Sequence, residues 1–228
     1  MTSEARKILV WDAPVRVCHW LMALSFAGAY LTSESERWRL VHVSLGYTLG
    51  ALVLFRVLWG LVGTRHARFA SFVRGPAAVG RYLASMAQGQ AEHHTGHNPA
   101  GAWAIVLLLG FGALTVASGW ANDQALGGHV LEELHEAMAN LMLVVVGVHV
   151  AGVLLSSWVH RENLVRAMLN GYKTGAPQDG IRWSVWPLAG LLLGAVLLFW
   201  WLQWQGAPPT ALQALVRQAA QYLHLAGV

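Results

Sequence analysis

Five long apolar stretches follow one another along the chain, with polar segments between them. We place them at about residues 17–33, 41–63, 101–121, 137–159 and 184–204. About 20 apolar residues are needed to cross the hydrocarbon core of a bilayer, so each stretch is predicted to be a transmembrane helix. The pattern therefore predicts an all-α membrane protein, in which a four-helix transmembrane bundle is followed by a fifth transmembrane helix.

The segments around these stretches suggest a division of the chain. Residues 1–175 are predicted to form the four-helix core, residues 176–205 the fifth transmembrane helix, and residues 206–228 a periplasmic tail with a short amphipathic helix. Within the core, Pro76 opens a weakly amphipathic segment that ends near Gly89. This segment is predicted to lie along the membrane surface.

The composition favours the same class. Hydrophobic residues make up 56% of the chain and charged residues only 11%, whereas a soluble domain carries about 25% charged residues. The net charge of +4 does not indicate nucleic-acid binding. The basic residues lie in short segments between apolar spans and form no continuous patch.

The distribution of Lys and Arg predicts the orientation, because these residues accumulate in cytoplasmic segments. With the N-terminus in the cytoplasm, eleven of them are cytoplasmic and three periplasmic, while Arg56 lies inside the second span. We therefore expect a multi-pass protein of the bacterial inner membrane with a periplasmic C-terminus. The cytoplasmic set is Arg6, Lys7, Arg16, Arg65, Arg68, Arg74, Arg81, Arg161, Arg166, Lys173 and Arg182, and the periplasmic set is Arg37, Arg39 and Arg217.

Four histidines lie within or at the ends of apolar stretches: His19, His42, His135 and His149. A single histidine of this kind is more often structural, but polar residues inside a membrane are costly and four at matched depths indicate a function. The 14 residues between His135 and His149 return a helical side chain to within about 40° of the same face, about 21 Å along the axis. The predicted topology then pairs His42 with His135 near the periplasm and His19 with His149 near the cytoplasm.

Two imidazoles that face each other inside a helix bundle suit the axial positions of a haem iron. Zinc would require three or four ligands in one cluster. The only cysteine is Cys18, and residue 15 is valine, so the chain has no C-x-x-C-H motif and a haem would be held without thioether bonds. A histidine-rich metal-ion transporter and a plain membrane anchor are the alternatives from other classes.

Other residues near these histidines are candidates for contacts with a haem. Gly46 and Gly50, about one and two turns after His42, would let a flat ring approach the backbone, with helix packing as an equal alternative. Arg56 would reach the depth of the cytoplasmic pair, either beside a propionate or as a snorkelling side chain. Arg16 and Arg39 each precede a candidate ligand by one turn and would pair with a haem carboxylate. Anchoring at the cytoplasmic membrane surface explains Arg16 well and Arg39 poorly.

Five stretches of sequence occur together in this chain: WDAPVRVCHW (11–20), HVSLGY (42–47), FRVLWGLVGTRHARF (55–69), GHNPAGAW (96–103) and LHEAMANLMLVVVGVHVAGVLLSSWVHRENLVRAM (134–168). Over about residues 8–175, the chain resembles the bacterial cytochrome b561 family, especially the branch related to the cytochrome b subunit of nickel-iron hydrogenase. The resemblance implies a four-helix core that binds two haems b. It also implies that His19, His42, His135 and His149 are the haem ligands.

Members of that family commonly exchange electrons with a quinone pool and serve a hydrogenase, another dehydrogenase or a c-type cytochrome. The resemblance therefore implies a di-haem b-type cytochrome that carries electrons between ubiquinone or menaquinone and a periplasmic or membrane redox partner. One relative oxidises superoxide and passes the electron to quinone, so a superoxide oxidase is an alternative. An electron-transfer subunit and a quinone-linked oxidoreductase both fit this pattern.

A possible quinone site lies before the third apolar stretch. His97 and Asn98 lead into this stretch near the cytoplasmic histidine pair, so both are candidates to line a quinone pocket. Solvated loop residues are the alternative. The expected partners are thus membrane lipid, a quinone and a redox protein, and not a nucleic acid.

Overall fold

The computed structural model describes residues 6–90 and 92–206. The chain divides into two units, residues 1–194 and residues 195–228, which are described separately. The tail predicted after residue 206 lies outside the described residues. All candidate site residues belong to the first unit.

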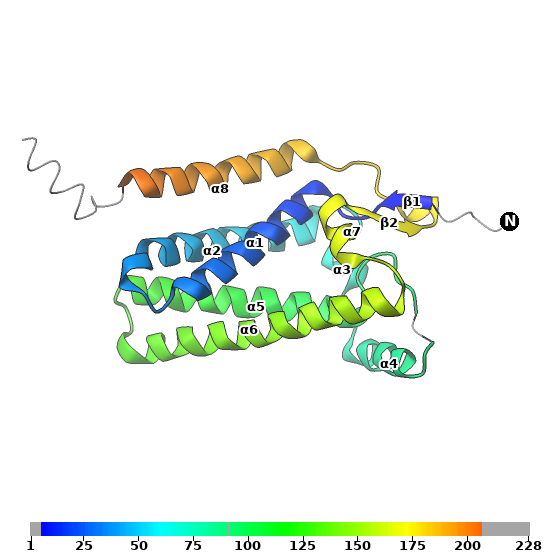
Figure 1. Ribbon diagram of the computed structural model, residues 1–228, viewed down its shortest axis with the longest axis horizontal. Coiled ribbons are helices and arrows are strands. Elements are labelled where there is room, and N and C mark those ends of the chain that lie inside the picture. Colours follow the sequence, from blue (N-terminus) through cyan, green and yellow to red (C-terminus); the bar gives the residue numbers. More distant parts are fainter. Residues whose placement is uncertain (1–5, 91, 207–228) are drawn as a thin grey trace, which may run out of the picture. The chain divides into compact units, whose positions relative to one another are not determined.

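Four long helices form the bundle of the first unit: α1 (Ala13–Thr32), α2 (Arg39–Val62), α5 (Pro99–Asp123) and α6 (Gly128–Val159). Short connections join α1 to α2 and α5 to α6, so that each pair is an antiparallel hairpin (Figure 1). The two hairpins pack against each other through α2 and α5. This arrangement brings residues from the beginning and the middle of the sequence into one core.

Four segments of the described chain are long and apolar enough to cross a membrane: Glu36–Val62, Pro99–Asp123, Gly128–Val159 and Trp186–Gly206. The last is α8, which begins in the first unit and ends in the second and contains no charged residue. With 20 residues, α1 is long enough to cross but is less apolar. The prediction of an all-helical, multi-pass membrane protein is confirmed.

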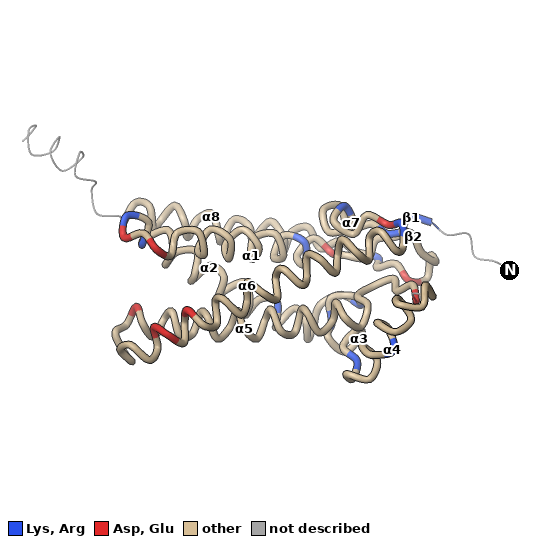
Figure 2. Tube along the Cα trace, turned by 60° about the horizontal axis from the view of Figure 1, so that its bottom comes forward, with Lys and Arg blue, Asp and Glu red and all other residues tan. Residues whose placement is uncertain are grey.

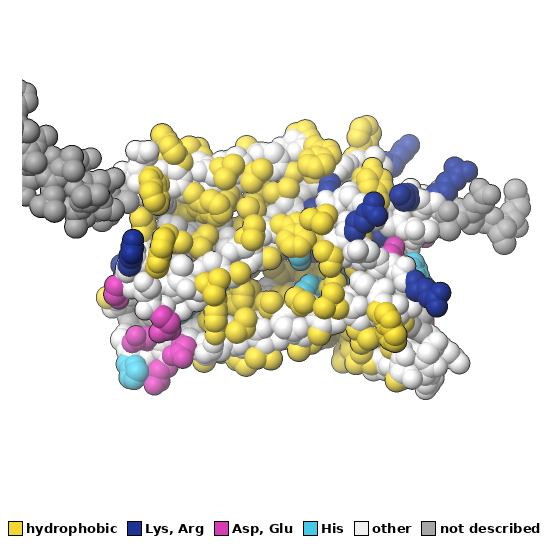
Figure 3. Space-filling view, viewed as in Figure 1, with side chains coloured by type: hydrophobic (Ala, Val, Ile, Leu, Met, Phe, Trp, Pro, Cys, Tyr) yellow, Lys and Arg dark blue, Asp and Glu magenta, His cyan; other side chains and the backbone are white. Residues whose placement is uncertain are grey.

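The side chains of these helices are distributed as expected in lipid. Large apolar residues such as Leu61, Leu114 and Val144 are exposed on the outside, and Figure 3 shows apolar side chains spread over the helices. Small hydroxyl residues are instead buried between the helices. Two of them, Thr48 and Ser118, donate to backbone carbonyls one turn earlier in their own helices. These buried residues are Ser25, Ser44, Thr48, Thr115, Ser118 and Ser156.

The two ends of the bundle differ. At the end that we call outer, after the predicted topology, Arg39 forms an ion pair of 2.9 Å with Asp123 and so joins α2 to α5. At the opposite, inner end, β1 (Arg6–Leu9) pairs with β2 (Tyr172–Gly175) as an antiparallel ribbon. Most charged residues of the first unit lie near these ends (Figure 2). The inner end also contains α3 (Phe69–Phe72), α4 (Pro76–Ala87), α7 (Leu164–Asn170) and the 3₁₀-helix η2 (Pro177–Asp179), and the outer end contains the 3₁₀-helix η1 (Glu36–Trp38).

A buried carboxylate organises the inner end. Asp12 is only 1% exposed, and its Oδ1 accepts a hydrogen bond of 2.8 Å from the backbone N–H of Val15 as the N-cap of α1. Its Oδ2 accepts hydrogen bonds from Trp59 Nε1 at 3.0 Å and from Thr64 Oγ1 at 2.6 Å. These bonds connect the start of α1 to the end of α2, which makes the loss of this carboxylate costly.

The connection after α7 depends on a glycine. Gly171 has φ of +91° and ends α7, and its carbonyl accepts hydrogen bonds from the backbone N–H groups of Val10 and Trp11. A Cβ at this position would lie 2.6 Å from the carbonyl oxygen of Trp11. A residue other than glycine would therefore strain both the turn and its contact with the N-terminal segment.

The structure corrects some predicted boundaries. The segment expected from Pro76 to near Gly89 is the helix α4, as predicted. By contrast, α6 begins at Gly128 and not near residue 137, because its first turns carry Glu132 and Glu133 and extend beyond the apolar stretch. The β1–β2 ribbon, α3 and α7 were not predicted, since they are too short to leave a periodic pattern.

Candidate functional site

The first pair of histidines lies toward the outer end. The ring centroids of His42, on α2, and His135, on α6, are 6.1 Å apart, and the ring planes make an angle of 80°. His42 Nδ1 is 2.8 Å from the carbonyl oxygen of Ala29, and His135 Nδ1 is 2.8 Å from that of Thr115. A carbonyl can only accept, so both Nδ1 atoms carry the proton and donate it. A neutral ring that donates from Nδ1 has its lone pair on Nε2, which is the form that binds a metal.

A glycine makes room for one of these rings. A Cβ at Gly119, on α5, would lie 2.7 Å from Cε1 and 2.9 Å from Nδ1 of His135. The hydroxyl of Ser118 is 3.4 Å from the same Nδ1. The backbone of α5 therefore packs directly against the imidazole of His135 and limits its movement.

The second pair lies toward the inner end. The ring centroids of His19, on α1, and His149, on α6, are 6.4 Å apart, with an angle of 54° between the planes. The ring of His19 also contacts Trp20 edge-on at 5.2 Å. Its Nδ1 is buried and has no hydrogen-bond partner among the described residues. Among the described residues, His19 thus lacks the backbone acceptor that orients each ring of the outer pair.

The spacing within each pair suits a metal ion between two imidazoles. Metal–imidazole bonds are about 2 Å long, so two opposed ligands place their ring centroids about 6 Å apart. The observed centroid distances are 6.1 Å and 6.4 Å. In the described part of the chain, no three His, Cys, Asp or Glu side chains come together as a metal site. The donor sets therefore fit a group that brings its own equatorial ligands, as haem does.

The arginines predicted near the haems have different surroundings. Arg56 is 5% exposed, its Cζ lies 4.9 Å from the ring centroid of Phe69, and its Nη1 has no partner among the described residues. Arg16 is buried, and its Nη1 donates to the carbonyl oxygen of Leu169 at 2.6 Å. Arg39 is 62% exposed and bonds to Asp123. Arg56 is therefore the one of the three with an unused buried donor.

The two glycines after His42 also differ. A Cβ at Gly50 would lie 2.7 Å from Val116 on α5, so Gly50 allows close helix packing. A Cβ at Gly46 would meet no atom within 4 Å. Packing against another described residue therefore does not explain Gly46, and the approach of a flat ring at this position stays a prediction.

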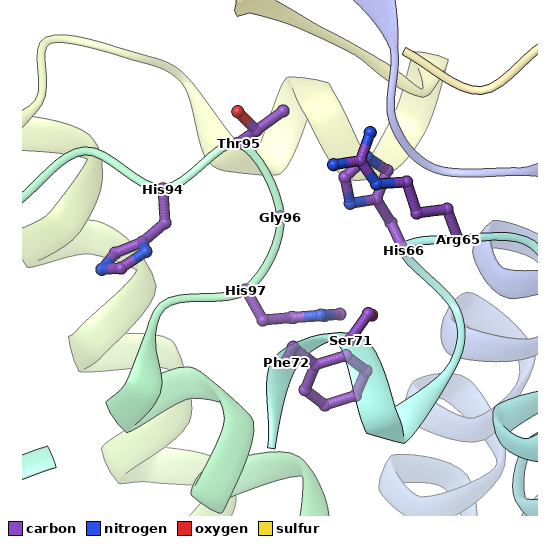
Figure 4. Close-up of a pocket in the computed structure, with 8 residues that line it drawn as sticks. All are labelled: Arg65, His66, Ser71, Phe72, His94, Thr95, Gly96 and His97. Atoms are coloured by element: carbon purple, nitrogen blue, oxygen red, sulfur yellow. The ribbon is translucent and has the colours of Figure 1, made fainter. Parts of the chain in front are cut away.

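The structure places His97 in the wall of a cavity of about 150 Å³ at the inner end (Figure 4). The faces of its ring contact Trp11 and Phe72, with both centroids at 4.4 Å. Asn98 instead caps α5, since its Oδ1 accepts a hydrogen bond of 2.7 Å from the backbone N–H of Gly101. The cavity is lined by Arg65, His66, Ser71, Phe72, His94, Thr95, Gly96 and His97.

Sequence reasoning missed the residues that support the outer pair. Thr115 and Ser118 are polar residues inside the apolar helix α5, and this was the signal that could have drawn attention to them. The carbonyl of Ala29 left no signal, because every residue has one. Gly119 was also missed, since the sequence does not show which helix faces it.

Two pairs of histidines at two levels of a helical membrane bundle suit a membrane b-type cytochrome. A family model of prokaryotic cytochrome b561 matches residues 10–171. The chain belongs to this family. It is therefore a membrane protein that binds haem b and takes part in electron transfer.

Several relatives support this assignment, and each is named a probable Ni/Fe-hydrogenase B-type cytochrome subunit. The protein of Rhizobium leguminosarum bv. viciae is 24% identical over 220 residues, which cover 74% of this chain and 89% of the relative. The protein of Azotobacter vinelandii is 28% identical over 213 residues, which cover 73% and 88%. The protein of Rhodobacter capsulatus is 22% identical over 215 residues, which cover 73% and 81%. No solved structure matches the chain.

Replacement of Gly119 by alanine is expected to weaken haem binding at the outer pair. The added Cβ would lie 2.7 Å from the ring of His135, so the ring must shift from its present position in the pair. Disturbing the surroundings of a metal ligand typically costs 10–100-fold in affinity. The haem-to-protein ratio of the purified variant measures the effect. Gly110→Ala is the matched control on α5, because a Cβ there meets no atom within 4 Å, and equal ratios in the two variants would contradict the expectation.

Proposed function

We propose that the chain binds two haems b and carries electrons across the membrane between a quinone and a redox partner on the opposite side. The observation that supports this most directly is the pairing of His42 with His135 and of His19 with His149, each at about the spacing of two axial ligands. Bound haem would take up and release one electron at its iron. The protein fixes the imidazoles and excludes water.

The separation of the pairs suits electron transfer. His135 and His149 both lie on α6, and their 14 residues correspond to about 21 Å along the axis. Each macrocycle extends into part of this distance, so the gap between the two ring edges is shorter. An electron that enters at one side of the membrane would therefore reach the other side in two short steps.

We place the inner end in the cytoplasm and the outer end in the periplasm of a bacterial inner membrane. The excess of Lys and Arg at the inner end supports this orientation. With α1 as a span, the chain crosses five times. Helix α1 packs against α2, which is itself long and apolar enough to cross a membrane, and this supports counting α1 as a span.

The partner is proposed to be a hydrogenase or another redox protein that docks at the outer end. The names of the relatives support a hydrogenase. The outer end offers exposed acidic side chains at Glu132 and Glu133, beside the short connection between α5 and α6. A protein surface with basic residues would complement them.

The quinone is proposed to bind at the inner end, within reach of the His19/His149 haem. His97 supports this site, because it lines the inner cavity and has a buried Nδ1 without a partner among the described residues. Asn98 lies beside it but uses its Oδ1 as a helix cap. The side chain of His97 is thus the stronger candidate for contact with a quinone oxygen.

The purified protein is expected to contain two non-covalent haems per chain, and acid-acetone should extract both. His42→Ala and His135→Ala should leave the same residual absorbance spectrum, because both remove the outer haem. His19→Ala and His149→Ala should share a second, different residual spectrum, because both remove the inner haem. The control is His129→Ala, whose side chain is 80% exposed at the outer end and which should keep both haems. A ratio of one haem per chain, or a spectrum shared by His42→Ala and His19→Ala, would refute the assignment.

The orientation predicts that a reporter fused after Val228 is active if it works only in the periplasm. Five crossings from a cytoplasmic N-terminus place the C-terminus outside. A second fusion in the connection between α6 and α8, at Gln178, should be active only with a cytoplasmic reporter. The opposite pattern at both positions would invert the topology, and cytoplasmic signals at both would show that one of the five helices does not cross.

Variants of the quinone candidates should separate quinone contact from helix capping. His97→Asn is expected to slow haem reduction by a quinol analogue at least tenfold while both haems remain bound. Asn98→Ser preserves a capping side chain, so it should behave like the unaltered protein if Asn98 acts only as a cap, whereas a slowed reduction would show that Asn98 also contacts quinone. Unchanged kinetics in His97→Asn, with slower reduction on changing Tyr47 near the outer pair, would move the quinone to the outer end.

A further inference from the structure

The inner end holds a histidine whose position suits proton exchange. We propose that His97 takes up a proton from the cytoplasmic side, through the inner cavity, when the His19/His149 haem gains an electron. This inference rests on the proposed function, since it requires a haem at the inner pair. It adds a role for His97 that does not depend on contact with a quinone.

The first support is the way in which His97 is held. Trp11 and Phe72 both pack against its ring, each at 4.4 Å between centroids and at a tilted angle. Its Nδ1 is buried without a hydrogen-bond partner among the described residues, and His97 lines the cavity. The two aromatic neighbours therefore limit the movement of the ring, and the cavity gives the residue a route to water.

The second support is the cavity itself. Its volume of about 150 Å³ is room for about five water molecules, at about 30 Å³ each. Its lining is mostly polar and includes Ser71, His94 and Thr95. Arg65, whose side chain is 54% exposed, reaches solvent at the same cavity. Water in such a cavity would connect His97 to the inner surface.

The third support is the charge around the ring. Four groups are near enough to His97 to disfavour its protonated form: Arg56 on α2, Lys173 on β2, His66 after α2 and His149 on α6. Burial lowers the pKa of His97 well below its usual range, and these four groups lower it further. The ring is therefore neutral at neutral pH before the electron arrives. An added negative charge nearby favours the protonated form and so raises this pKa.

The step balances in charge. With haem bound between His19 and His149, the electron would be taken up at its iron, and one proton from cavity water would bind the unprotonated ring nitrogen of His97. The cavity water regains its proton from the cytoplasmic solution. When the electron leaves toward its acceptor, His97 releases the proton, either to the cavity or to the acceptor if this is a quinone. The net charge of the inner end then stays nearly constant through each cycle.

The test is a redox titration of the haem-loaded protein without quinone, at several pH values between about 5 and 9. Full coupling of one proton to one electron lowers the midpoint potential by about 59 mV for each tenfold fall in proton concentration. We expect a pH-dependent potential for the inner haem, with the dependence strongest on the acidic side because the pKa of His97 starts low. His97→Asn should remove most of this slope and leave the outer haem unchanged.

The matched control is His93→Asn, the same substitution in the same loop at a residue that does not line the cavity. It should keep the slope of the unaltered protein. If His97→Asn retains the slope, another group such as a haem propionate takes the proton, and the proposal is wrong. It is equally wrong if the inner haem of the unaltered protein shows no slope. Absence of the inner haem from the unaltered protein would instead overturn the proposed function, so the two failures are distinguishable.

Discussion

An imidazole inside a membrane bundle needs a partner for its N–H group, because no water is available there. In the outer pair, that need determines which helices touch. His42 on α2 donates to the carbonyl of Ala29 on α1, and His135 on α6 donates to the carbonyl of Thr115 on α5. Each hairpin is thus closed by a hydrogen bond from one of the paired histidines. The same bonds that hold the hairpins together leave Nε2 of each ring available for a metal.

The helices of the inner end are joined by a different kind of contact. Asp12 at the start of α1 accepts hydrogen bonds from Trp59 and Thr64 at the end of α2, as well as from the backbone of Val15. A buried carboxylate thus joins these helices, whereas backbone carbonyls accept the joining bonds at the outer end. Arg56 nearby retains a buried donor, and His19 retains a buried nitrogen, without partners among the described residues. The hydrogen bonds of Asp12 therefore hold the inner end together, while Arg56 and His19 each keep a buried nitrogen that no described residue binds.

Much of this arrangement follows from patterns that a sequence displays. The apolar stretches predicted the long helices, and the 14-residue spacing of His135 and His149 predicted one helix that serves two levels. The structure brings His42 beside His135 at the outer level and His19 beside His149 at the inner level. The acceptors of the outer pair are backbone carbonyls, and the ribbon between β1 and β2 joins segments more than 160 residues apart. Such contacts exist only in the folded chain, so composition and periodicity do not reveal them.

Two glycines of α2 show why spacing in the sequence does not by itself determine what a glycine does. Gly46 and Gly50 follow His42 at successive turns, and the sequence offers the same two interpretations for both. In the structure, Gly50 faces Val116 of α5 at a distance that excludes a side chain, whereas Gly46 faces no atom within 4 Å. The first contact brings α2 against α5 and so joins the hairpins, and the second leaves room beside His42. Four residues of an α-helix make one full turn plus about 40°, so Gly46 and Gly50 point in slightly different directions. Gly50 therefore serves packing against α5, whereas Gly46 leaves open space about one turn from His42.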